Sequence, residues 1–169
     1  MKIKEIMTER PIIIGSTDTV LDAIEIMKNN EGIRHLPVLR GKQLVGMLSA
    51  SDIREILGLA SGKPIDRLQL QRKISSVMTK NVITVAPQDD VINAAHHFAE
   101  GKFGSLPVIE NGDLVGILST GDLFNRHIIP LLEELTKQAE TNDTLPLEAE
   151  KGAIPTDERL KTLKMKKKT

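Results

Sequence analysis

The sequence contains no cysteine, no tryptophan and no tyrosine, and only three of its 169 residues are phenylalanine. Without cysteine there can be no disulfide bond, no thiol nucleophile and no thiolate metal site. No apolar run approaches the roughly 18 residues that a membrane span needs, and the N-terminus lacks the apolar core of a signal peptide. We therefore expect a cytoplasmic globular protein whose core is built from Ile, Val, Leu and Met.

The sequence also has no excess charge of either sign. Lys+Arg and Asp+Glu number 23 each, so no overall field attracts nucleic acid or an anionic membrane surface. From Thr141 the chain becomes polar, and it ends in a lysine cluster. This predicts a solvated, poorly ordered tail over residues 141–169, with binding of nucleic acid or an acidic partner as the less favoured role of the lysines.

The most informative feature of the sequence is a stretch that occurs twice. Residues 36–39 read Leu-Pro-Val-Leu and are followed by a polar turn and an apolar run over 44–53; residues 106–109 and 114–123 repeat this pattern. Each copy reads as a strand, a turn, a second strand and a helix that opens on a serine and an aspartate. The duplication predicts two similar structural units.

The repeat begins well before this stretch. Ile-x-x-Ile-Met-Thr at residues 3–8 recurs as Ile-x-x-Val-Met-Thr at 74–79. The β-branched runs at 12–14 and 82–85 predict strands, and apolar residues spaced i, i+3, i+4, i+7 from Val20 and from Val91 predict helices. Each β-α-β-β-α unit has about 55 residues and is too small to bury its own core, so we expect the two units to pack face to face.

This pattern gives an expected domain organisation. Unit one covers residues 1–60 and unit two covers 73–130, with a linker over 61–72 that starts at a Gly- and Pro-containing stretch. A further amphipathic helix is predicted over 131–140.

Two sets of side chains suggest how such a unit could bind a ligand. A helix N-terminus presents free N–H groups to a phosphate, the neighbouring hydroxyls add donors, and an aspartate there can accept both hydroxyls of a ribose. A glycine in the second strand lets a flat base approach, and the apolar strand end offers a slot for a purine. The hydroxyl and acidic candidates are Ser49, Ser51, Asp52, Ser119, Thr120 and Asp122, and the glycine and apolar candidates are Gly46, Gly116, Ile14 and Val85.

The repeated motifs resemble those of tandem CBS-domain (Bateman) proteins, over residues 2–128. They are Ile/Val-Met-Thr, Leu-Pro-Val, and Val-Gly followed by an apolar residue and Leu-Ser-x-x-Asp, in this order and twice. The pattern is most similar to small stand-alone prokaryotic CBS pairs, including those of the acetoin-utilisation type. The resemblance implies an α/β fold of two units related by a pseudo-twofold axis, and a homodimer. It also implies a non-enzymatic regulatory module that binds AMP, ADP, ATP, NAD or S-adenosylmethionine through these positions and acts on a client protein.

The two copies differ just before the Leu-Pro-Val strand. Copy one has Arg34 and His35, whereas copy two has Gly104 and Ser105. In the family, basic residues here often reach nucleotide phosphates, and arginine offers a bidentate fork. We predict that the site with Arg34 and His35 prefers a phosphorylated ligand and that the other is weaker, empty or filled by a less charged adenosine compound.

Each of these assignments has a structural alternative. The serines and aspartates could be plain helix caps, the glycines could mark a close strand crossing, and Pro37 and Pro107 could be core or edge packing rather than part of the binding site. Arg34 could be solvated and His35 could lie at an interface. The whole module could then be a homodimerisation platform with degenerate pockets.

Catalysis and metal binding are not predicted. The sequence has no P-loop and no Ser-His-Asp pattern. His96 and His97 are adjacent, so on a helix they point about 100° apart and cannot share a metal, and His127 has no evident partner.

Overall fold

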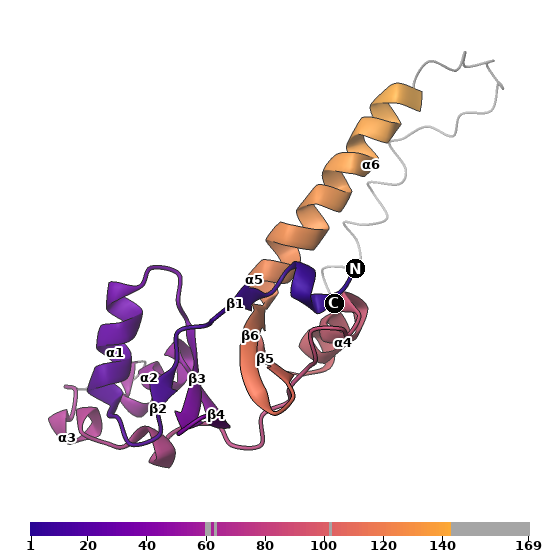
Figure 1. The fold of residues 1–169 in the computed structure, drawn as a ribbon. Helices are drawn as coiled ribbons and strands as arrows, with labels where there is room; N and C mark the ends of the chain where they lie inside the picture. Colours follow the sequence, from indigo (N-terminus) through magenta and orange to yellow (C-terminus); the bar gives the residue numbers. More distant parts are fainter. Residues whose placement is uncertain (60–61, 63, 102, 143–169) are drawn as a thin grey trace, which may run out of the picture. The chain divides into compact units, whose positions relative to one another are not determined.

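The structure is a computed structural model that describes residues 1–59, 62, 64–101 and 103–142. It has two compact units, Met1–Glu133 and a second that starts at Glu134. The first unit holds both copies of the repeat (Figure 1). Apart from residues 141 and 142, the predicted tail lies outside the described residues, and the lysine cluster lies there with it.

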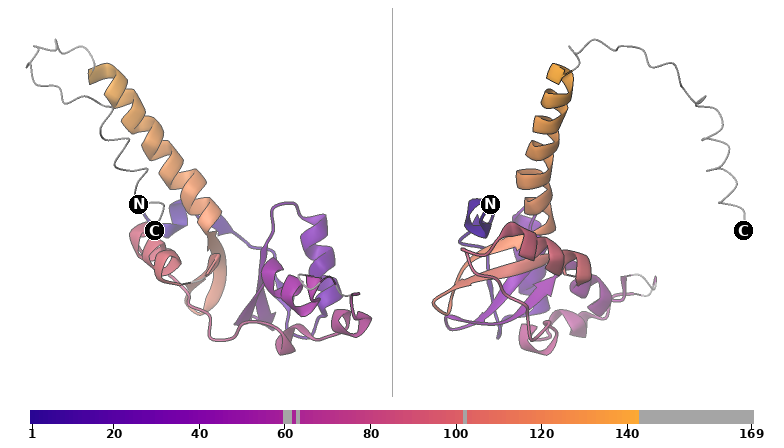
Figure 2. Two further views of the ribbon diagram at one scale, coloured as in Figure 1. Left: turned by 180° about the vertical axis from the view of Figure 1, so that it is seen from behind. Right: turned by 90° about the vertical axis from the view of Figure 1, so that its right-hand side faces the viewer.

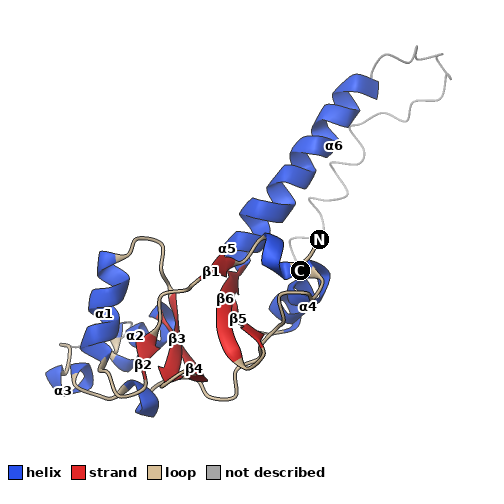
Figure 3. Cartoon of the chain, viewed as in Figure 1, coloured by secondary structure: helices blue, strands red, loops and turns tan. Residues whose placement is uncertain are grey.

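The first unit consists of two halves, each with a three-stranded sheet, in the orders β2-β3-β4 and β1-β6-β5. The strands are β1 (Thr8–Glu9), β2 (Ile14–Gly15), β3 (His35–Arg40), β4 (Gln43–Ser49), β5 (Ser105–Glu110) and β6 (Asp113–Ser119). The helices are α1 (Val20–Asn29), α2 (Ala50–Ile56), α3 (Arg67–Leu70), α4 (Val91–Glu100), α5 (Thr120–Leu123) and α6 (Ile129–Asn142). Strands β4 and β6 contact each other, with α1 and α2 beside the first sheet and α4 beside the second (Figure 3). The predicted α/β fold of two similar units is confirmed.

The local signals for the two long helices of the repeat are confirmed. Helix α1 begins at Thr19, whose side chain accepts the N–H of Asp22 while the Asp22 carboxylate accepts the N–H of Thr19 at 2.8 Å. Helix α4 begins at Asp90, whose carboxylate accepts the N–H of Ile92 at 3.1 Å. Their apolar faces bury Val20 and Val91 in the cores of the two halves.

The β-branched runs form less strand than the sequence predicts. Of residues 12–14 only Ile14 is in a strand, and of residues 82–85 only Val85 forms a bridge, to Val108. Ile12 and Ile83 are each 37% exposed, because the backbone before the bridge crosses to the other half and lines a cavity instead of a neighbouring strand. Tertiary context here overrides local β-propensity.

The closing helix of copy two also differs from the prediction. Helix α5 does not end before a separate helix but continues through a π-helical turn, Phe124–Ile128, into α6. Pro130 follows this π-helical turn inside the continuous helix, where its ring nitrogen has no N–H to donate to the preceding turn.

The first residues of each copy pack on the opposite half. Ile3 and Ile6 are buried in the core of the second half, and Ile74 is buried in the core of the first. Strand β1 pairs with β6, and Met47 of β4 exchanges backbone hydrogen bonds of 2.9 and 2.8 Å with Thr79. Both views of Figure 2 show the N-terminal segment beside the second half. Each half is therefore completed by a segment of the other copy, an exchange that the expected boundaries at 60 and 73 did not include.

The exchanged segments explain the two glycines of the repeat. A Cβ on Gly46 would lie 2.6 Å from the Met78 sulfur and 2.7 Å from the Thr79 carbonyl oxygen. A Cβ on Gly116 would lie 2.6 Å from the Met7 sulfur. Both glycines therefore permit a close crossing by the exchanged segment.

Candidate functional site

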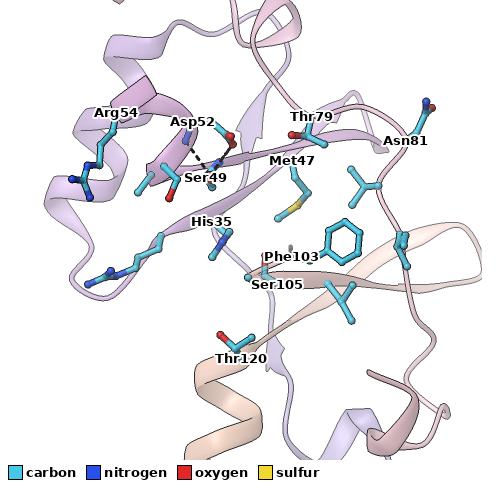
Figure 4. A pocket seen from close by; sticks show the side chains of 17 residues that line it. His35, Met47, Ser49, Asp52, Arg54, Thr79, Asn81, Phe103, Ser105 and Thr120 are labelled. Carbon is cyan, nitrogen blue, oxygen red and sulfur yellow. Dashed lines mark hydrogen bonds between the residues drawn. The ribbon is translucent and has the colours of Figure 1, made fainter. Parts of the chain in front are cut away.

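A cavity of about 600 Å³ lies between the two halves. Its volume falls within the range of small-molecule sites, roughly 300–1,000 Å³. Figure 4 shows Ser49 and Asp52 on one side of it, Phe103 on another, and His35 between Ser49 and Ser105. The first half contributes Arg34, His35, Met47, Ser49, Ala50, Ser51, Asp52 and Arg54, and the remaining lining residues are Thr79, Asn81, Val82, Ile83, Phe103, Gly104, Ser105, Leu106 and Thr120.

Asp52 is held in place by the start of α2. Its Oδ2 accepts the N–H and the hydroxyl of Ser49, both at 2.7 Å, while Ser49 Oγ accepts the N–H of Asp52 at 3.1 Å. Among the described residues, no hydrogen bond is made to Oδ1 of Asp52. The capping box thus fixes the carboxylate and leaves one oxygen for a ligand hydroxyl.

Three of the N–H groups at the start of α2 are already bonded within the protein, which leaves that of the cavity-lining Ser51 for a phosphate. Those of Ser49 and Asp52 bond within the capping box, and that of Ala50 donates to the Arg34 carbonyl at 2.8 Å. The helix is also only seven residues long. An anionic group in this cavity would therefore be bound mainly by side chains.

An apolar surface lies across the cavity from this helix. Ile83 is 37% exposed and Phe103 is 41% exposed, and with Val82 they line the cavity. The Phe103 ring packs over Gly101, where any Cβ would overlap the ring. Flat aromatic ligands stack well on such surfaces.

These apolar residues were missed by the sequence analysis, which placed the purine slot at Ile14 and Val85. Both of those side chains are in the cores, 2% and 6% exposed, and line neither this cavity nor the second one. Val82 and Ile83 belong to the short segment that follows Met78-Thr79, and their apolar character was visible in the sequence. Their position opposite Asp52 was not, because it depends on the exchange of segments between the halves.

Another cavity, of about 310 Å³, contains the corresponding residues of copy two. Of these two cavities, we call the one of about 600 Å³ the larger and this one the smaller. Asp122 Oδ2 accepts the Ser119 N–H at 2.9 Å and its hydroxyl at 2.5 Å. Unlike Asp52, it also forms an ion pair, with Arg126 Nε 3.8 Å from Oδ1. The second carboxylate is therefore already partly neutralised.

Each cavity has at its rim a residue in the left-handed backbone region. Asn81 has a φ of 55° and lines the larger cavity, and Arg10 has a φ of 48° and lines the smaller one. They occupy corresponding positions of the repeat. Such backbone conformations are uncommon outside glycine and occur frequently at functional sites.

The structure brings together some predicted site residues and separates others. Those that line the larger cavity are Arg34, His35, Ser49, Ser51, Asp52 and Thr120, the last of which was expected in the other site. Those that line the smaller cavity are Arg34, His35, Ser119 and Asp122. Those that line neither are Ile14, Pro37, Gly46, Val85, Pro107 and Gly116, all of them buried.

His35 lies at the centre of the region between the two cavities. Burial lowers the pKa of its imidazole, with Asp52 opposing and Arg34 reinforcing that shift. Its ring is close to Gly104, where a Cβ would lie 2.5 Å from Nε2. The imidazole therefore reaches across to the second copy and favours its neutral form there.

The described residues contain no group of three or more His, Cys, Asp or Glu side chains placed to hold a metal ion. Among the helices described, none is both long enough and apolar enough to cross a membrane.

A family model for the CBS domain matches residues 3–59 and 74–128. The chain therefore belongs to the CBS-domain family and carries two tandem copies of the domain. It is 30% identical over 152 residues to the uncharacterized protein MJ1426 of Methanocaldococcus jannaschii, covering 73% of this chain and 89% of that protein.

Two solved structures are similar to it. A Vibrio cholerae protein assigned to acetoin utilization (AcuB) is 28% identical, with a TM-score of 0.63 and coverage of 86% of this chain and 98% of that chain. The CBS domain pair of protein MJ0100, in complex with 5′-methylthioadenosine and S-adenosyl-L-methionine, is 25% identical, with a TM-score of 0.64 and coverage of 80% and 98%.

Some relatives are longer enzymes. Inosine-5′-monophosphate dehydrogenase of Korarchaeum cryptofilum is 31% identical over 120 residues, but this chain spans only 23% of that enzyme.

Proposed function

We propose that this chain is a regulatory module that binds an adenosyl ligand in the larger cavity between its halves. The observation that carries the proposal is the Asp52 carboxylate, fixed by Ser49 with one oxygen unused, opposite the apolar surface of Val82, Ile83 and Phe103. In this arrangement Oδ1 of Asp52 accepts the ribose hydroxyls and the apolar surface holds the purine. The adenosyl ligands in the related MJ0100 pair support this choice.

The polar end of the cavity favours a phosphorylated ligand. Arg34 and His35 line it, and Arg54 lies at the same end as Asp52. Binding would regulate a client protein if the ligand prefers one arrangement of the halves over another. AMP, ADP, ATP, NAD and S-adenosylmethionine are the ligands to compare.

The test is isothermal titration calorimetry and thermal unfolding with each of these ligands, on the wild type and on Asp52→Ala. Unfolding is followed by circular dichroism because the chain lacks Trp and Tyr. A ligand at 100 times its Kd should stabilise the wild type by about 2.7 kcal/mol. Asp52→Ala should lose most of that stabilisation.

Asp52 also caps α2, so a matched control is needed. Asp22→Ala removes the equivalent capping box from α1, away from the cavity. It should cost about 1 kcal/mol of stability, as a lost cap does, and leave ligand affinity unchanged. Equal ligand binding by the wild type and Asp52→Ala would contradict the proposed site.

The alternative is a ligand-independent homodimerisation module. It is favoured if no adenosyl ligand stabilises the wild type while light scattering gives the mass of a dimer. Exposed apolar side chains on helices, such as Ile92 (59%) and Phe124 (55%), are available for that contact.

A further inference from the structure

The two cavities share part of their lining. Arg34, His35 and Ser105 line both of them, and among the described residues no other side chain does. His35 pairs across its hairpin with Ser49, the cap of α2, and Ser105 pairs across its hairpin with Ser119, the cap of α5. We call these three residues the shared wall. It lies between the cavity that contains Asp52 and the cavity that contains Asp122.

Ser105 is the buried member of the shared wall. The residue is only 6% exposed, and its hydroxyl makes no hydrogen bond to any other residue that the structure describes. A buried hydroxyl without a partner costs about 1–3 kcal/mol, so natural proteins seldom keep one without a use. Its oxygen is shielded from both cavities, so the hydroxyl can donate to a phosphate oxygen only after turning toward one of them.

The side chains before the Leu-Pro-Val strand are large in copy one and small in copy two. There is therefore one shared wall between the cavities and not a separate wall for each. Copy two has glycine at position 104, and the His35 ring occupies the space that a Cβ would need, 2.5 Å from Nε2. Copy one supplies the imidazole and the guanidinium, and copy two supplies the hydroxyl. By symmetry each cavity would have its own basic pair, but here one pair lies against both.

We propose that the shared wall is a single anion-binding site used by both cavities, so that one phosphorylated adenosyl ligand weakens the binding of a second. An adenosyl ligand without phosphate does not compete for the wall and fills either cavity independently. This inference rests on the proposed function. Arg54 lines only the larger cavity and Arg10 only the smaller, so each provides a cation that is not shared.

The test compares AMP with 5′-methylthioadenosine by calorimetry on the full chain. Asp52→Ala and Asp122→Ala each close one cavity and give the single-site Kd values. In the wild type, the second AMP should bind at least tenfold more weakly than AMP binds to the corresponding single-site variant. For 5′-methylthioadenosine, the affinity of the second binding event in the wild type and the affinity of the corresponding single-site variant should agree within twofold.

A second set of variants assigns the effect to the shared wall. Arg34→Ala should weaken AMP and reduce the tenfold antagonism to below threefold. The matched control Arg54→Ala should weaken AMP in the larger cavity and leave the antagonism unchanged. Two independent AMP sites in the wild type, or failure of AMP to bind Asp52→Ala at all, would overturn the inference. Failure of both ligands to bind any variant would instead overturn the proposed function.

Discussion

The two halves have the same backbone plan but are not equivalent at their candidate sites. In the first, Asp52 keeps Oδ1 available, whereas in the second Arg126 lies 3.8 Å from Oδ1 of Asp122. The first half also supplies both Arg34 and His35, and the second supplies only the small Gly104 and Ser105 beside them.

Residues that build the fold occur in both halves, whereas some residues of the candidate binding sites occur in only one. The capping boxes, the cores and the close crossings at glycine occur in both halves, because each is required to build the unit. The basic pair, Arg34 and His35, occurs only in the first half. The two copies can thus have the same fold while a single shared wall lies between the two cavities.

The largest expected effect tests whether the two cores are equivalent. Leu48 and Leu118 occupy corresponding positions and are both 0% exposed. Leu48→Ala and Leu118→Ala should each cost about 3 kcal/mol, within the range of buried leucine truncations. Urea unfolding followed by circular dichroism should give one transition for each variant, because the exchanged segments join the halves. Two separate transitions would show that the halves unfold independently.

The next effect distinguishes the two close crossings. Gly46→Ala places a Cβ 2.7 Å from the Thr79 carbonyl oxygen, whereas Gly116→Ala places one 3.2 Å from the Thr8 carbonyl oxygen. Backbone cannot yield as a methionine side chain can, so Gly46→Ala should cost about 1–3 kcal/mol and Gly116→Ala less. Urea midpoints at equal slope measure the difference. A larger loss for Gly116→Ala would reverse the comparison.

A smaller effect concerns pH and is expected from the first half only. Burial lowers the pKa of His35, so the unfolded chain binds the proton more readily than the folded one. Stability should therefore fall as the pH drops through about 6.5, and the loss should end below the folded-state pKa. Copy two has Ser105 at this position and adds no such slope.

The measurement for His35 is urea unfolding at several pH values between about 7.5 and 5, across the range where the proton binds. His35→Gln should lose this part of the pH dependence, and the exposed His96→Gln serves as the matched control. An unchanged slope in His35→Gln would contradict the assignment.

The smallest expected effect is that of removing Arg126, which would leave Oδ1 of Asp122 without its ion pair and so make this carboxylate more like that of Asp52. The Arg126 side chain is 53% exposed and also donates to the carbonyls of Ile6 and Met7 at 3.3 Å, so Arg126→Ala should change stability by about 1 kcal/mol. Freeing Oδ1 of Asp122 should raise the affinity of the smaller cavity for 5′-methylthioadenosine a few-fold, measured in the Asp52→Ala background. Arg54→Ala should have no such effect there.

Features that depend on neighbouring residues could be predicted from the sequence. The repeat, the helices starting at Val20 and Val91, and the Ser-Asp pairs at 49–52 and 119–122 all follow from local spacing and capping, and the structure contains them.

Features that depend on distant packing could not be predicted. Whether residues 3–8 pack on their own copy or on the other is decided by contacts remote in sequence, and the position of the apolar wall follows from that exchange. The sequence therefore indicated Asp52 but not Phe103, and it placed the purine surface at Val85, past the cavity-lining Val82 and Ile83.

The exchange of N-terminal segments also determines when the protein can finish folding during its synthesis. Residues 3–9 leave the ribosome long before their partner β6, where Thr8 meets Ile117. Until that strand has been made, Ile3 and Ile6 have no core to enter, and the first half itself waits for Ile74. Such long-range pairing slows folding and leaves apolar residues exposed in the nascent chain. The module can therefore be completed only after β6 has been synthesised.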